Sequence, residues 1–73
     1  MAAGKAMISH LDIYRAANEL IHQYGEEAAI RAAMRADSLA EKGDLDGYAV
    51  WRRILTAIDV ILADANAPGR HVH

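Results

Sequence analysis

Two adjacent arginines beside the only tryptophan are the residues of this sequence best suited to bind a ligand. Trp51, Arg52 and Arg53 follow one another between two β-branched residues. Guanidinium groups bind carboxylates and phosphates, and an aromatic ring beside them is typical of sites for acidic peptides or nucleic acids. In the alternative interpretation, Trp51 anchors the core, Arg52 pairs with an acidic neighbour and Arg53 is solvated. The negative net charge favours this alternative, and Arg52 and Arg53 stay candidates for ligand binding.

The four histidines are the candidates for a metal site. His71 and His73 have the spacing of a short chelating pair, and His10 with Asp12 could add ligands. A structural metal site needs about four convergent donors, and no two histidines here stand four positions apart on one helix face. We therefore expect no metal and no cofactor. His10 falls on the apolar side of its helix, which predicts a partly buried, hydrogen-bonded histidine.

Asp37 is the one carboxylate that the helical pattern places beside apolar residues. Its neighbours on the wheel include Ile30 and Met34. A carboxylate in that position needs a donor such as Arg15 or Arg52, which predicts a polar lock between helices. The functional alternative is an acid that works in a pocket. No nucleophile or base accompanies it in the sequence, so the lock is favoured.

Recognisable catalytic motifs are missing from the sequence. It has no glycine-rich phosphate loop, nucleophile elbow or His-Glu-x-x-His pair, and no cysteine for a disulfide or a thiolate metal site. We therefore expect a protein that is not an enzyme.

Hydrophobic periodicity predicts three amphipathic helices, at 9–24, 26–42 and 46–65. Ser9 has the position of an N-cap, Gly25 and Gly43 mark helix ends, and Asp44 or Asp46 caps the last helix. The expected fold is all-α: a small three-helix bundle in which helices two and three form an antiparallel hairpin. Residues 1–7 are expected to be a flexible leader, 8–65 the helical core and 66–73 a flexible tail. The expected core comprises Ile13, Tyr14, Ala17, Leu20, Ile21, Tyr24, Ala29, Ala33, Ala36, Leu39, Ala40, Val50, Trp51, Ile54, Leu55, Ile58, Ile61 and Leu62.

Two resemblances accompany this pattern. The segments 14–17, 24–25, 28–30, 36–37, 43–44 and 50–54 resemble members of a family of short uncharacterised bacterial proteins, chiefly alphaproteobacterial. The resemblance implies no activity and no catalytic residue. Ala36, Leu39, the Gly43-Asp44 turn and Tyr48 also resemble a single tetratricopeptide-type hairpin, but the repeat of that class does not recur along the chain.

Size and charge narrow the class of protein further. A chain of 73 residues makes one domain whose core supplies only roughly 3–5 kcal/mol, so association with another chain is a common source of added stability. A net charge of −2 with mixed signs argues against nucleic acid as a partner. No apolar run reaches membrane-spanning length and no signal peptide is recognisable, so a cytoplasmic, bacterial-type protein is expected.

The third helix carries an apolar face that covers about half of its circumference. A face that wide requires two packing neighbours, or one neighbour and a partner chain. The leading hypothesis is therefore a small, non-enzymatic interaction module that forms a homodimer or binds a protein partner. The expected interface residues are Trp51, Ile58, Leu62, Ile30 and Met34. The alternative function is the binding of an acidic ligand or nucleic acid through Arg52 and Arg53.

Overall fold

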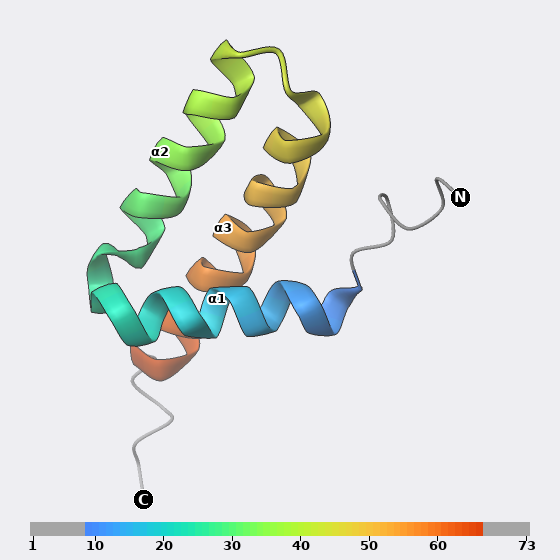
Figure 1. Ribbon diagram of the computed structural model, residues 1–73. Helices are drawn as coiled ribbons and strands as arrows, with labels where there is room; N and C mark the ends of the chain where they lie inside the picture. The colour runs from blue at the N-terminus through green and yellow to red at the C-terminus, as the bar shows by residue number, and fades with distance from the viewer. Residues whose placement is uncertain (1–8, 67–73) are drawn as a thin grey trace, which may run out of the picture.

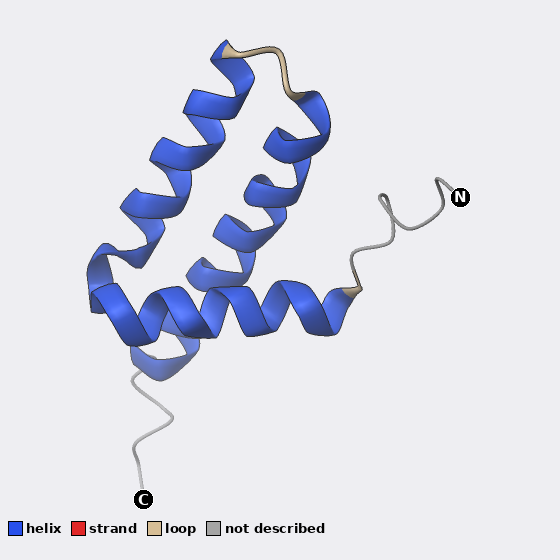
Figure 2. Ribbon diagram, viewed as in Figure 1, coloured by secondary structure: helices blue, strands red, loops and turns tan. Residues whose placement is uncertain are grey.

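The computed structural model describes residues 9–66, and its elements are all helical (Figure 1). They are α1 (His10–Tyr24), the short 3-10 helix η2 (Gly25–Glu27), α2 (Ala28–Glu41) and α3 (Leu45–Asn66). No strand occurs in this range, as Figure 2 shows. The expected leader lies outside the described residues, as do residues 67–73 of the expected tail, whereas Asn66 ends α3.

The all-α prediction is confirmed, and so is the hairpin of α2 and α3, which lie side by side in Figure 1. The predicted count of three separate helices is not confirmed. No nonhelical residue separates α1, η2 and α2, so the helical residues form two continuous runs, 10–41 and 45–66. The first run bends sharply at Gly25, and the bend gives α1 and α2 different directions.

Local hydrogen bonds fix most of the helix ends near the predicted positions. The Asp12 amide donates to the Ser9 hydroxyl at 3.1 Å, which confirms Ser9 as the N-cap of α1. Gly25 and Gly43 have positive φ angles of 60° and 82°. The Asp44 carboxylate accepts from the amide of Gly47 at 2.9 Å, so Asp44 and not Asp46 caps α3.

The long helix α3 is the centre of the packing. It contacts α2 along the hairpin and α1 where α1 crosses it, whereas α1 and α2 touch each other far less. The central cluster takes Ile13 and Ala17 from α1, and its other members are Ala28, Ala32, Ile54, Ala57 and Ile58. Alanines in α2 allow its backbone to come close to α3. The wide apolar face of α3 is therefore covered on two sides by its own chain.

The buried face of α2 matches the predicted one at Ala36 and Leu39 and differs from it elsewhere. Ala28 and Ala32 are fully buried, whereas Ala40, expected in the core, is exposed. Ala57 of α3 is also buried without having been predicted. Alanines occupy both flanks of α2, so rotating its face changes the buried area little and the sequence hardly distinguishes the two settings.

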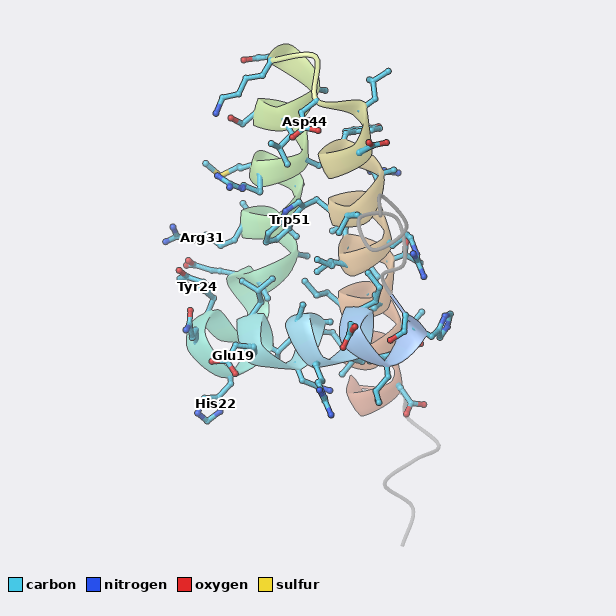
Figure 3. The ribbon with its side chains drawn as sticks, turned by 45° about the vertical axis from the view of Figure 1, so that its right-hand side comes forward. Glu19, His22, Tyr24, Arg31, Asp44 and Trp51 are labelled. Atoms are coloured by element: carbon cyan, nitrogen blue, oxygen red, sulfur yellow. The ribbon has the colours of Figure 1, made fainter. Side chains whose placement is uncertain are left out.

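Tyr24 is another correction to the predicted core. It is the last residue of α1, directly before the bend, and its side chain is exposed. The Arg31 guanidinium lies 4.6 Å from the centre of its ring, so a cation and not the core covers the aromatic face (Figure 3).

None of the helices within residues 9–66 is long and apolar enough to cross a membrane.

Candidate functional site

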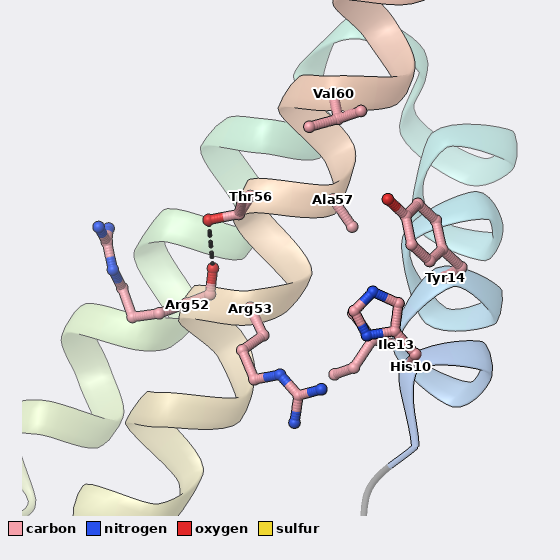
Figure 4. Close-up of a pocket in the computed structure, with 8 residues that line it drawn as sticks. All are labelled: His10, Ile13, Tyr14, Arg52, Arg53, Thr56, Ala57 and Val60. Carbon is pink, nitrogen blue, oxygen red and sulfur yellow. Dashed lines mark hydrogen bonds between the residues drawn. The ribbon is translucent and has the colours of Figure 1, made fainter.

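A groove of about 340 Å³ lies where the first half of α1 faces the middle of α3 (Figure 4). We call it the α1–α3 groove. Its lining residues are His10, Ile13, Tyr14, Arg52, Arg53, Thr56, Ala57 and Val60.

Helical spacing explains why these residues meet. His10, Ile13 and Tyr14 stand at the i, i+3 and i+4 positions of α1, so they share one face of that helix. Arg53, Thr56 and Ala57 repeat the same spacing on α3, and Val60 follows one turn later. The crossing of α1 over α3 then brings the two stripes opposite each other.

The bottom of the groove is apolar and its edge is partly apolar. Ile13 and Ala57 are buried members of the core cluster. Tyr14 is half-buried and packs against the same cluster, and Val60 leaves 51% of its surface exposed. The groove therefore lies on the buried core cluster, and a bound apolar group would cover the exposed part of Val60.

The polar groups of the groove are mainly donors. The Thr56 hydroxyl donates to the Arg52 carbonyl at 3.1 Å, so its proton is already used. Tyr14 contributes a hydroxyl, His10 an imidazole and Arg53 a guanidinium. The rings of His10 and Tyr14 lie 5.6 Å apart at 51°, which orders the aromatic wall. None of the described residues that line the groove is acidic, so their charge favours anions.

The two candidate arginines do not act as a pair. Figure 4 shows the Arg53 guanidinium on the α1 side of α3, whereas the Arg52 guanidinium points away from α1. Neighbouring helical residues differ by about 100° around the axis, which accounts for the divergence. No ion pair joins Arg52 to a carboxylate within residues 9–66, contrary to the alternative interpretation. Of the two arginines, Arg53 is thus the one whose guanidinium faces α1 across the groove.

The expected interface residues are dispersed over the fold. Ile58 is fully buried, so it supports the core and has no surface to offer a partner. Trp51 lies between α2 and α3 (Figure 3), partly exposed, with the Arg35 guanidinium 5.9 Å from the centre of its ring. Leu62 is partly exposed near the other end of α3. Ile30 and Met34 stand on α2, each with 61% of its surface exposed.

The polar residues that the sequence suggested for a metal site or a lock between helices do not come together either. His10 is exposed at the start of α1, so the prediction of a partly buried histidine is wrong. Asp37 is exposed too, and it makes no ion pair within residues 9–66, so the predicted lock between helices is wrong as well. No three histidine, aspartate or glutamate side chains of the described residues gather where they could hold a metal ion. His71 and His73 lie outside the described residues.

Sequence reasoning found Arg53 but missed Tyr14, Thr56 and Val60 as its companions. Arg53, Thr56 and Val60 lie on one flank of the α3 wheel, and that signal was available. The position of α1 across this flank could not be predicted from the sequence, because it depends on the bend at Gly25.

Comparison of the chain with models of protein families, with curated proteins and with solved structures found no match. The resemblance to short bacterial proteins therefore stays a prediction.

Proposed function

We propose that this chain is a small, non-enzymatic interaction module whose α1–α3 groove binds a carboxylate held beside an apolar group on a partner protein. The observation that carries the proposal is the position of the Arg53 guanidinium beside the apolar Ile13, in a groove whose described lining residues include no acidic side chain. A guanidinium supplies charge-assisted hydrogen bonds to a carboxylate, and the apolar bottom of the groove adds contact within a few ångströms of it.

The donors of the groove favour an acidic ligand over a basic one. The Tyr14 hydroxyl and the His10 imidazole stand on the α1 wall, opposite Thr56 and Ala57 on α3. A carboxylate at the edge can accept from Arg53 while its apolar neighbour lies against Ile13. Among the described lining residues, an ammonium group in the same place would meet a guanidinium and no carboxylate, which is unfavourable.

A protein partner is favoured over nucleic acid. Binding of nucleic acid depends on neutralising several phosphates at once, and the described residues bring one guanidinium, that of Arg53, to the α1 side of the groove. The chain as a whole is negative, with a formal net charge of −2. Acidic side chains beside apolar ones are instead common on amphipathic helices.

The experiment uses sodium hexanoate as a minimal probe, because it joins one carboxylate to an apolar chain. Amide chemical shifts of the labelled protein are followed during titration, with hexylammonium chloride as the charge-reversed control. We expect hexanoate to shift the amides of Ile13, Tyr14 and Ala57 with millimolar affinity, and hexylammonium to leave them unchanged. Arg53→Ala should weaken hexanoate binding about tenfold, because an ion pair in a half-open groove contributes about 1.4 kcal/mol.

Arg15→Ala is the matched control variant. Arg15 is another arginine of the helical surface, it does not line the groove, and its own pairing with Asp12 is long at 4.0 Å and exposed. We expect this variant to bind hexanoate as the wild type does. Equal shifts with hexanoate and hexylammonium, or equal loss of binding in both arginine variants, would refute the proposed site.

Homodimerisation through α3 remains a second proposal, in a reduced form. Its support is the partly exposed surface of Trp51 and Leu62, because Ile58 is in the core. The two residues stand about three turns apart on α3, so such an interface would have to run along the helix.

A further inference from the structure

The outer side of α2 carries a single stripe in which two apolar residues lie between carboxylates. The stripe begins at Glu27, the last residue of η2, and continues along α2 at alternating steps of four and three residues from Ile30 to Met34, Asp37 and Glu41; all five residues are exposed. Residues at this spacing line one face of a helix. We call this stripe the α2 outer face. Ile30 and Met34 form its centre, and acidic side chains stand at both ends.

This face is poorly suited to pairing with itself. If two copies packed their α2 helices antiparallel with Ile30 opposite Met34, Glu27 of one copy would face Asp37 of the other. A parallel arrangement would bring each carboxylate to its own equivalent. Both symmetric arrangements therefore oppose like charges around a small apolar centre, which disfavours them.

The α1–α3 groove has the complementary character. On α3, Arg53 and Ala57 stand four residues apart, and Val60 follows three residues later. On α2, Met34 and Asp37 stand three residues apart. Side chains three or four residues apart on a helix lie about 5–6 Å from each other at Cβ. A carboxylate near Arg53 and an apolar side chain over Ala57 thus have the same separation as Asp37 and Met34.

Asp37 is the carboxylate of this face that stands next to Met34, since Glu41 lies one turn further along the helix. Glu27 already has a cationic neighbour, the Arg31 guanidinium at 3.9 Å, and Arg31 also covers the ring of Tyr24. Asp37 has no ion pair within residues 9–66. Its charge is therefore available to an arginine from outside the molecule.

We propose that a second copy of this chain is a partner of the groove: the α2 outer face of one copy docks into the α1–α3 groove of the next. Met34 covers Ala57 and Val60, and Asp37 binds Arg53. This inference rests on the proposed function, and it adds the identity of the partner. The two docking surfaces are different, so the contact is heterologous and joins copies head to tail in a ring or an open chain.

Two variants separate this arrangement from a symmetric dimer. Met34→Glu places a charge in the apolar centre of the α2 outer face and leaves the groove intact. Arg53→Glu reverses the charge at the groove and leaves the α2 outer face intact. Both residues are exposed, so neither change removes core packing. Sedimentation velocity is measured from micromolar to millimolar concentration at low and high ionic strength.

For the wild type, we expect species beyond the dimer that grow with concentration and weaken as salt is added. Each variant alone should be monomeric, with self-affinity reduced at least about tenfold. An equal mixture should form a one-to-one pair and nothing larger, since the intact groove of Met34→Glu receives the intact face of Arg53→Glu. Leu45→Glu, which alters an exposed apolar residue outside both surfaces, should associate as the wild type does.

Three results would overturn the inference: a wild type that stays monomeric at low salt, an Arg53→Glu variant that self-associates normally, or a mixture without the paired species. The hexanoate titration is repeated on Met34→Glu, which is expected to be a monomer. If that variant binds hexanoate but the wild type does not self-associate, the groove function stands and the partner is wrong. If hexanoate binding also fails, the proposed function itself is wrong.

Discussion

Ile58 is the large side chain that the described fold encloses completely, and it lies in the cluster that joins all three α-helices. Its place explains why the middle of α3 has little tolerance for change. A surface role for Ile58 would require the helices to separate. Substitution with a charged residue therefore tests folding and says nothing about association.

Ile58→Ala is expected to destabilise the protein by about 3 kcal/mol, through lost apolar burial and the cavity left behind. A single core of this size supplies only roughly 3–5 kcal/mol, so the variant should be largely unfolded at room temperature. Circular dichroism with urea titration measures the change. Val60→Ala, on the same helix but half exposed, should shift the midpoint only slightly. A folded Ile58→Ala with the wild-type midpoint would contradict the assigned core.

At the scale of the element, α2 packs mainly through small residues, since three of its four buried residues are alanines. Ala28, Ala32 and Ala36 present almost no exposed surface toward the hairpin partner. Such a face stabilises the hairpin through close backbone approach and many short contacts. It also leaves no room for a larger side chain.

Ala32→Leu should therefore cost about 1–3 kcal/mol, because the added carbons force α2 away from α3. Ala40→Leu is the matched control. It makes the same chemical change on the same helix at an exposed position, and we expect almost no loss. Urea denaturation of both variants gives the comparison. An equal effect at the two positions would mean that the alanine face is not the tight contact.

The sequence predicted the helices, their caps and the hairpin, because these depend on residues close together in the chain. Ser9, Gly43 and Asp44 each act within a few residues of their own position. The groove could be predicted only in part. Arg53 was recognisable as a cation, but its neighbours depend on the path of α1, and that path follows from a single backbone angle at Gly25.

The buried face of α2 shows a second limit of the pattern. Leucine or isoleucine on one side of a helix would define the inward direction, because burying them contributes far more than burying alanine. In α2 only one large residue, Leu39, is buried, whereas Ile30 and Met34 lie outside and alanines lie on both flanks of the core side. Leu39 is therefore the one large side chain of α2 that marks the inward direction, and periodicity defines the orientation of this helix only loosely.

At the scale of the whole molecule, α1 is the element that both closes the core and builds one wall of the groove. It reaches this position through the bend at Gly25, whose φ of 60° and ψ of −130° suit glycine and few other residues. A Cβ added there would meet no atom within 4 Å, so the preference for glycine is a matter of backbone angles alone.

The bend allows α1 to pack against the α3 helix of its own chain. If residue 25 carried a side chain, its backbone would be strained in the present bend. Straightening residues 10–41 into one helix about 48 Å long would relieve that strain and extend α1 away from its own α3. Two such molecules can each insert the extended arm into the vacant place on the other, which is domain swapping. We expect Gly25→Ala to form this exchanged dimer, seen in mixed labelled and unlabelled samples as intermolecular contacts between Ile13 and Ile54. A monomeric Gly25→Ala that keeps these contacts within one chain would show instead that packing on α3 outweighs the backbone preference.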